Sequence, residues 1–125
     1  MVGVDIVEIK RFENFLEKFA EKALEKYLDK EEMKLIKNAQ SAAGFFAAKE
    51  AVSKALGLGI SKTCGFHDIK IYKLPNGAPS FTLSSHLVKT FNIKSVSLSI
   101  AHDGGFAIAA VIIEGEPIEK QKLEH

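Results

Sequence analysis

The sequence predicts a single α+β domain. Three observations indicate this fold class: a segment rich in β-branched residues opens the chain, helical periodicity dominates residues 10–56, and strand-like segments separated by Gly-containing turns fill the second half. The length of 125 residues fits one compact domain, with 46% apolar and 26% charged side chains as in an ordinary globular protein. We expect this domain to span residues 1–122.

The first half of the chain predicts one strand and three helices. Residues 2–9 are apolar on both faces, which favours a strand inside a sheet. Asp29 is a suitable N-cap for a short helix because Glu32 follows three residues later. Ser41 is expected to cap a longer helix, with Gly57 as its stop signal. The helices are expected over residues 10–28, 30–37 and 41–56.

The second half predicts strands joined by tight turns. Asn76-Gly77 is a strong hairpin signal between two short strands. Val96, Leu98 and Ile100 alternate with polar residues and predict a strand with one apolar face. The last strand is apolar throughout and is expected to be buried. The strands are expected over residues 66–74, 80–83, 95–102 and 106–113, with a short helix over residues 84–91.

Charge and composition exclude several classes of function. The net charge of +1, from 17 basic and 16 acidic side chains, gives no general attraction to nucleic acid or to a membrane surface, and we expect neither partner. The longest apolar run, residues 106–113, is far below the roughly 20 residues that cross a bilayer. With a single Cys64 and no secretion signal, we expect a cytoplasmic protein. Leu123, Glu124 and His125 resemble the start of an expression tag and are excluded from functional reasoning.

Two polar residues are unusual for their predicted strands. Asp5 interrupts an apolar strand, although Asp is depleted in strands. A buried carboxylate has to be hydrogen-bonded, paired or bound to a cation, so Asp5 is either a structural residue or a metal ligand or acid–base group. His102 ends an alternating strand beside an Asp-Gly-Gly turn, where it is either structural or part of a site.

The predicted helix over residues 41–56 carries a compact polar stripe. Alanines on one side allow close packing against a sheet, whereas Lys49, Glu50, Ser53 and Lys54 gather on the other side. The stripe places one carboxylate between two ammonium groups. It is either a solvated helix face, with Glu50 and Lys54 as an i,i+4 pair, or a site for charged groups.

Three segments together resemble a known family. The chain opens with Gly-Val-Asp-Ile-Val-Glu-Ile-Lys-Arg at residues 3–11. Phe-Ala-Ala-Lys-Glu-Ala-Val-Ser-Lys-Ala follows at residues 46–55, and Ser-Leu-Ser-Ile-Ala-His at residues 97–102. In this order and on so short a chain, the segments are similar to those of the bacterial holo-[acyl-carrier-protein] synthases. These are the small members of the 4′-phosphopantetheinyl transferase superfamily.

The resemblance implies a magnesium-dependent enzyme. Such enzymes move the 4′-phosphopantetheine arm of coenzyme A onto a serine of an apo-acyl carrier protein and release adenosine 3′,5′-bisphosphate. The family motif maps Asp5 and Glu50 to the metal ligands and adds Lys54 to the catalytic group. Lys54, His102 and Lys49 fall near the coenzyme A phosphates. Two carboxylates suit Mg²⁺, which prefers oxygen ligands and shares them with phosphate groups, and Lys acts as a point charge.

The resemblance also implies how the molecule meets its partners. Arg11 falls where the family contacts the carrier protein, and the turn that contains Gly77 and Pro79 resembles the segment beside the adenine. The implied fold is a 4′-phosphopantetheinyl transferase-like domain, with a small, mainly antiparallel sheet packed against a long helix. Family members of this length assemble as trimers, so we expect a homotrimer with active sites between subunits.

Two departures from the family pattern affect basic side chains. Phe45 stands where the family usually has Arg, so a positive charge is lost there. The region after Arg11 is longer than usual, and Lys18, Lys22 and Lys26 are candidates for a second carrier contact. On a single helix these three lysines and Arg11 would fall within roughly 80° of each other, and the open alternative is an ordinary solvated helix face.

Two other functions fit the same residues. One is a transferase of the same fold that serves a carrier protein of secondary metabolism, which a comparison of rates on different carriers would reveal. The other is a non-catalytic nucleotide-binding trimer. The presence of Asp5, Glu50 and Lys54 argues against this second alternative.

Overall fold

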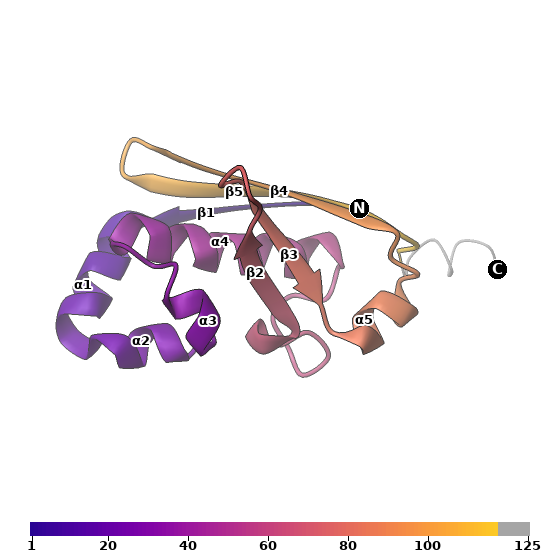
Figure 1. Cartoon of the computed structure of the whole chain (residues 1–125), viewed down its shortest axis with the longest axis horizontal. Coiled ribbons are helices and arrows are strands. Elements are labelled where there is room, and N and C mark those ends of the chain that lie inside the picture. The colour runs from indigo at the N-terminus through magenta and orange to yellow at the C-terminus, as the bar shows by residue number, and fades with distance from the viewer. Residues whose placement is uncertain (118–125) are drawn as a thin grey trace.

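The computed structural model describes residues 1–117 as a three-stranded antiparallel sheet covered on one face by a long helix. The sheet order is β1 (Val2–Glu8), β5 (Phe106–Glu114), β4 (Ser95–Asp103), and the helix is α4 (Ala39–Ala55). Figure 1 shows α4 lying along the sheet. The expected domain end at residue 122 and the expected tag remnant at 123–125 lie outside the described residues. The predicted α+β class, with a long helix against a small antiparallel sheet, is confirmed.

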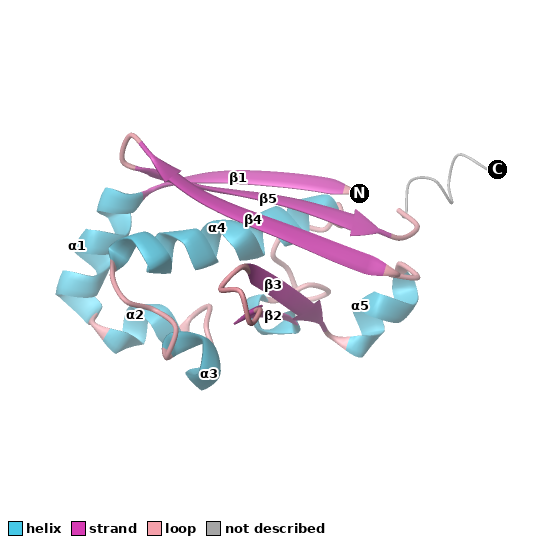
Figure 2. Ribbon diagram, turned by 45° about the horizontal axis from the view of Figure 1, so that its top comes forward, coloured by secondary structure: helices cyan, strands magenta, loops and turns pink. Residues whose placement is uncertain are grey.

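Smaller elements surround this centre. A separate two-stranded sheet of β2 (Ile69–Lys73) and β3 (Pro79–Leu83) follows the 3₁₀ turn Phe66–Asp68. Three short helices lie at one end of the molecule, and one lies at the other end, near the N-terminus (Figure 2). The former are α1 (Ile9–Phe19), α2 (Glu21–Glu25) and α3 (Lys30–Met33), and the latter is α5 (Ser85–Thr90). None of the described helices combines the length and the apolar character of a membrane span.

The single helix expected over residues 10–28 is wrong, because the chain turns between α1 and α2. Ala20 adopts a φ of +48°, a conformation that ends α1 at Phe19. For a non-Gly residue this conformation (φ 48°, ψ −132°) costs roughly 1–3 kcal/mol of stability. The turn brings Leu24 and Tyr27 back against the core, where they are 8% and 4% exposed. Tertiary burial therefore overrides the local helical pattern.

Helix capping agrees with the sequence in one case and differs in another. Asp29 and Glu32 form the expected capping box, although α3 ends at Met33 rather than near residue 37. Asn38, not Ser41, is the N-cap of α4: its side chain accepts from the Ser41 backbone N–H, and the Ser41 hydroxyl in turn accepts from the backbone N–H of Asn38. A polar capping residue was correctly expected at the start of this helix, but the predicted residue lies three positions after the actual N-cap.

The first strand lies at an edge of the sheet and not inside it, contrary to expectation. Its residues alternate between α4 and the uncovered outer face, where Val2, Val4 and Ile6 are 69%, 54% and 59% exposed. The central strand β5 also alternates, and Ile112 is 61% exposed beside Val2. The continuous apolar character of both strands therefore does not mean burial on both faces.

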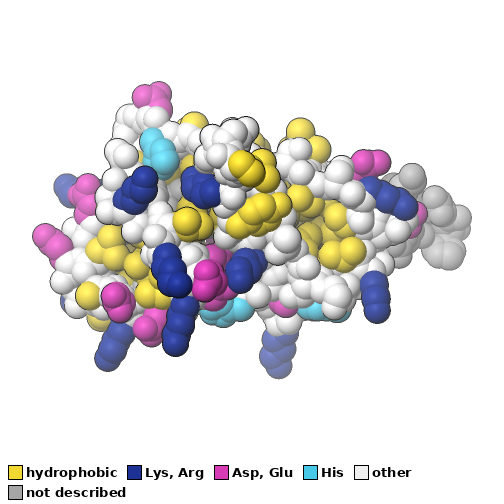
Figure 3. All heavy atoms as spheres, in the orientation of Figure 1, with side chains coloured by type: hydrophobic (Ala, Val, Ile, Leu, Met, Phe, Trp, Pro, Cys, Tyr) yellow, Lys and Arg dark blue, Asp and Glu magenta, His cyan; other side chains and the backbone are white. Residues whose placement is uncertain are grey.

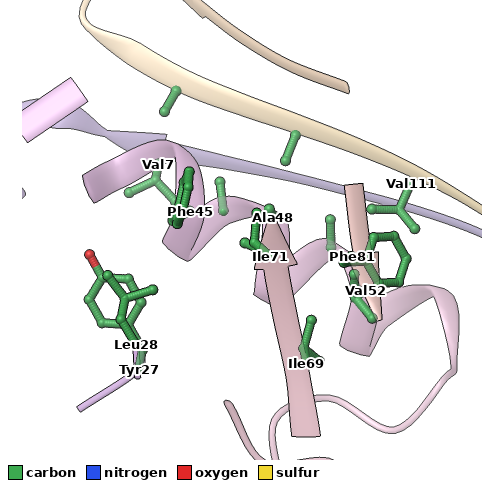
Figure 4. Close-up of a cluster of buried hydrophobic side chains, with 14 of the residues drawn as sticks. Val7, Tyr27, Leu28, Phe45, Ala48, Val52, Ile69, Ile71, Phe81 and Val111 are labelled. Atoms are coloured by element: carbon green, nitrogen blue, oxygen red, sulfur yellow. The ribbon is translucent and has the colours of Figure 1, made fainter. Parts of the chain in front are cut away.

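The core lies between the sheet, α4 and the β2–β3 hairpin. Figure 4 shows Val7 and Val111 of the sheet together with Val52 of α4 and the inward-facing Ile71 and Phe81 of the hairpin. Val96, Leu98 and Ile100 pack against this core from β4, as their alternation predicts. Alanines on α4 permit the close approach of helix and sheet.

Candidate active site

Asp5 and Lys54 meet where β1 crosses α4. Lys54 Nζ donates to Asp5 Oδ1 at 2.6 Å, and the Asp5 side chain is only 13% exposed. Gly3, two residues earlier on the same face of β1, makes this approach possible. A Cβ at Gly3 would lie 1.9 Å from the carbonyl oxygen of Ala51, so only glycine lets the strand lie this close to the helix. The anomalous aspartate is thus held at the helix surface.

Glu50 completes a cluster of two carboxylates and one ammonium group, which we call the carboxylate cluster (Asp5, Glu50 and Lys54). Burial, followed by the negative charge of Asp5, raises the pKa of Glu50, and Lys54 partly opposes this shift. Within residues 1–117, no group of three His, Cys, Asp or Glu side chains is placed to hold a metal ion. Asp5 and Glu50 supply two oxygen ligands of the kind that Mg²⁺ prefers, so a Mg²⁺ ion here would take its remaining ligands from phosphate and water.

Lys49 does not belong to this cluster, so the expected polar stripe is wrong for two of its four residues. Lys49 is fully buried and donates to Glu32 Oε1 at 2.9 Å, to the Tyr27 carbonyl at 2.7 Å and to the Phe66 carbonyl at 3.1 Å. Burial lowers the pKa of Lys49, and the hydrogen bond and charge of Glu32 oppose that shift. Ser53 is also buried. A phosphate contact by Lys49 would require breaking this network, so the expected role near coenzyme A is corrected.

His102 lies in a second cluster, on the side of the molecule formed by β4 and the β2–β3 hairpin. Its Nε2 lies 2.9 Å from the Gln40 carbonyl, which can only accept, so Nε2 carries the proton and Nδ1 remains available. A cavity of about 130 Å³ lies beside it. We call this the His102 cavity; it is lined by Ser41, Gly44, Phe45, Lys73, Pro79, Ile100 and His102.

The hairpin turn and Gly44 shape this cavity. Gly77 has a φ of +87° and closes the turn by donating to the Leu74 carbonyl at 2.8 Å. Gly77 is not among the lining residues, whereas Pro79 is. A Cβ at Gly44 would lie 3.0 Å from Ile100 and 3.3 Å from His102 Nε2, so glycine allows α4 to approach β4 here.

The structure does not bring the two clusters together within one chain. Asp5 is on edge strand β1 and His102 on the opposite edge strand β4, with β5 between them. The edge strands are therefore roughly 10 Å apart. Along α4, Glu50 and Lys54 project roughly 140–180° away from Phe45. The predicted site residues thus occupy opposite flanks of the central helix.

Arg11 borders an apolar pocket of about 190 Å³ at the end formed by the short helices. Aromatic side chains dominate its lining, and Phe12, Tyr27, Phe46 and Phe66 pack with ring centroids 5.4–6.2 Å apart. We call this the aromatic pocket. Hydrophobic, basic and acidic side chains intermingle at this end of the molecule in Figure 3.

The break at Ala20 changes which lysines accompany Arg11. Lys26 lines the aromatic pocket, and Lys18 lines an adjoining hollow with Arg11. Both ammonium groups lie over the Phe19 ring, at 5.7 Å for Lys18 and 5.9 Å for Lys26. Lys22 lines neither hollow. The expected four-residue basic stripe is therefore wrong as a helical stripe, but three of its members lie near each other.

Several residues at these sites could not be predicted from the sequence. Phe46 gave a weak signal, because an aromatic residue among the polar side chains of a predicted helix can mark a binding surface. Phe12 gave no such signal, because it fits the regular apolar pattern of its predicted helix. Lys73 gave none, because one Lys in a predicted strand is ordinary. Gly3 and Gly44 matter through close approaches that only a folded chain reveals.

Comparison with known proteins agrees with this architecture. The family model for the 4′-phosphopantetheinyl transferase superfamily matches residues 1–111. The holo-[acyl-carrier-protein] synthase of Sulfurimonas denitrificans is 55% identical over 120 residues, covering 96% of this chain and 99% of that protein. The corresponding protein of Campylobacter fetus is 54% identical over 114 residues, covering 91% of this chain and 99% of its own.

Solved structures show the same fold. The Helicobacter pylori holo-[acyl-carrier-protein] synthase in complex with coenzyme A superposes with a TM-score of 0.87 at 50% identity, covering 91% of this chain and 100% of that one. The Bacillus anthracis synthase gives a TM-score of 0.76 at 36% identity, over 92% and 96% of the two chains. These matches confirm the resemblance first seen in three short segments. The chain belongs to the 4′-phosphopantetheinyl transferase superfamily, among the holo-[acyl-carrier-protein] synthases.

Proposed function

We propose that this chain transfers the 4′-phosphopantetheine arm of coenzyme A to a serine of an apo-acyl carrier protein, releasing adenosine 3′,5′-bisphosphate. The observation that carries this proposal is the carboxylate cluster, which places Asp5 and Glu50 beside Lys54 in a chain of this family. Relatives that match over nearly their whole length are named as synthases of this kind, and one was solved in complex with coenzyme A.

The cluster supports a magnesium-dependent phosphoryl transfer. Asp5 and Glu50 would hold Mg²⁺, which supplies positive charge to the diphosphate of coenzyme A and to the departing phosphate. Lys54 is 52% exposed on its side chain, so its ammonium group can turn from Asp5 towards the same phosphates. One of the two carboxylates can accept the proton of the attacking serine, and positioning with charge neutralisation carries most of the rate enhancement.

The positions of the two clusters support a homotrimer with active sites between subunits. One coenzyme A molecule that needs both clusters has to take the carboxylate cluster from one chain and the His102 cavity from the next. Such head-to-tail contacts close into a ring, and the family resemblance favours three subunits. The exposed apolar face of the sheet at Val2, Val4, Ile6 and Ile112 offers surface for such an assembly.

The surface around Arg11 supports carrier recognition. Arg11, Lys18 and Lys26 surround an aromatic pocket, and this combination fits an acidic partner that inserts an apolar side chain.

We place the reaction in the cytoplasm, because the free thiol of Cys64 is buried and suits a reducing compartment.

A mass-spectrometric transfer assay tests the proposal. The purified chain, coenzyme A, Mg²⁺ and apo-acyl carrier protein should yield a carrier heavier by about 340 Da, the mass of the transferred arm. Asp5→Asn and Glu50→Gln should each reduce the rate by at least about 100-fold, because each removes a metal ligand. Glu31→Gln is the matched control, since this carboxylate lies on the surface beside Lys34. Near-normal rates for either cluster variant at limiting Mg²⁺ would overturn the metal assignment.

A further inference from the structure

The His102 cavity has the chemistry of an anion site. Of its lining residues in the described chain, Lys73 and His102 can carry positive charge and none is acidic. Pro79 and Ile100 contribute apolar surface beside them. A ligand that combines a flat apolar group with an anionic group fits this lining better than a neutral or cationic ligand does.

Lys73 is held at this cavity by the hairpin. It is the last residue of β2 and pairs directly with Pro79, the first residue of β3, so both side chains stand on the same face of the hairpin. Beyond this pair the turn is closed by hydrogen bonds of 2.8 Å from Leu74 to Ala78 and from Gly77 to Leu74. The backbone of Lys73 therefore has little freedom to move away from the cavity.

The ammonium group of Lys73 lies over the ring of Phe45, 5.9 Å from its centroid. Phe45 is 2% exposed, so its ring is a fixed platform, and a cation is attracted to its face. Phe45 is also the residue that replaces the Arg usual in the family. Lys73 of the hairpin therefore places a positive charge beside position 45 of α4, where the family usually has an Arg.

We propose that Lys73 binds the phosphate monoester on the ribose of coenzyme A. This inference rests on the proposed function, which places the diphosphate at the carboxylate cluster because the bond that breaks lies there. The monoester is then the only anionic group of coenzyme A left for the His102 cavity, and it carries nearly two negative charges at neutral pH. Lys73 can face it, and Nδ1 of His102 can donate to it when the ring is an imidazolium with a hydrogen on each nitrogen.

Two coenzyme A substrates separate this role from a general effect on the cavity. Lys73→Met is assayed for transfer with coenzyme A and with 3′-dephospho-coenzyme A, which lacks the monoester. We expect the KM for coenzyme A to rise about tenfold, as for loss of one charge-assisted hydrogen bond, and the KM for the dephospho form to change less than about twofold. Lys73→Arg should recover most of the loss.

Lys70→Met is the matched control, because Lys70 lies on the same strand but its ammonium group lies 3.6 Å from Asp29. It should leave both KM values unchanged. Equal increases for the two substrates in Lys73→Met would assign Lys73 to the diphosphate or to cavity shape, and no increase would remove it from the site. Either result overturns the proposal.

A binding measurement keeps this inference distinct from the proposed function. Calorimetry compares adenosine 3′,5′-bisphosphate with adenosine 5′-monophosphate on wild type and Lys73→Met, without any transfer. Lys73→Met should weaken the binding of adenosine 3′,5′-bisphosphate by about tenfold and leave the binding of adenosine 5′-monophosphate unchanged. An inactive wild type that still shows this difference would refute the transferase function but not the role of Lys73. Equal binding of the bisphosphate by both proteins would refute the role even in an active enzyme.

Discussion

Replacing Lys49 by Met should strongly destabilise the fold. The ammonium group has three acceptors: Glu32 Oε1 and the Tyr27 carbonyl, in buried hydrogen bonds, and the Phe66 carbonyl, in a partly buried one. Glu32 is itself 1% exposed and would keep its bonds from the backbone N–H groups of Asp29 and Ile71, but not a compensating charge. Removing one partner of a buried ion pair costs about 3–5 kcal/mol, a large part of a total stability of about 5–15 kcal/mol.

Urea denaturation at pH 7 measures this change. Glu32→Leu combined with Lys49→Met should recover at least about half of the loss, since no buried charge then lacks a partner. Lys34→Met is the control: its ion pair with Glu31 is 73% and 68% exposed, so the unfolding free energy should change by less than about 0.5 kcal/mol. A loss below about 1 kcal/mol for Lys49→Met, or a double variant as unstable as the single one, would refute the reasoning.

Three further variants test other parts of the molecule. Arg11→Ala should raise the KM for the carrier several-fold and flatten the salt dependence of that KM, while leaving the KM for coenzyme A unchanged. Titrations of both substrates at two ionic strengths measure this, and equal increases of the two KM values would remove Arg11 from the carrier surface. Ser84 donates to Asp68 at 2.6 Å, and this bond is the main cause that lowers the pKa of Asp68 below 3.8. A carboxyl group whose pKa is depressed in the folded state stabilises the fold at pH values above its ordinary pKa, so Ser84→Ala should lower the unfolding free energy at pH 7 by about 1 kcal/mol. Urea titrations should show this difference between wild type and variant shrinking as the pH falls below about 4. A difference that does not depend on pH would contradict this linkage. Gly3→Ala puts a Cβ 1.9 Å from the Ala51 carbonyl and should reduce stability by about 1–3 kcal/mol together with activity, whereas an unchanged melting temperature and rate would show that β1 can shift freely.

The features that could be predicted from the sequence depend on residues close together in the chain. The capping box of Asp29 and Glu32 and the end of α4 just before Gly57, which has a positive φ, each involve a few neighbouring positions. The alternation in β4 likewise records which face of one strand is apolar. Asp5 could be singled out because a carboxylate in an apolar strand is unfavourable unless it is paired or bound, and the structure gives it Lys54.

Other features depend on which surfaces meet, and only the tertiary structure decided them. Ala20 turns the chain because Leu24 and Tyr27 gain burial against the core, a gain that no local pattern contains. Lys49 and Glu50 are consecutive and about 100° apart on α4. Lys49 is buried in its ion pair with Glu32, whereas Glu50 lies near enough to Asp5 for that negative charge to raise the pKa of Glu50.

The separation of Asp5 from His102 is the clearest case. Local sequence shows that Asp5 and His102 are unusual, but not that they lie on opposite edges of one sheet. That separation follows from the strand order β1-β5-β4, in which the pairing of β1 with β5 joins residues about a hundred positions apart. Long-range pairing of this kind is stabilised by burial across the whole sheet, so it leaves no signature within either segment alone.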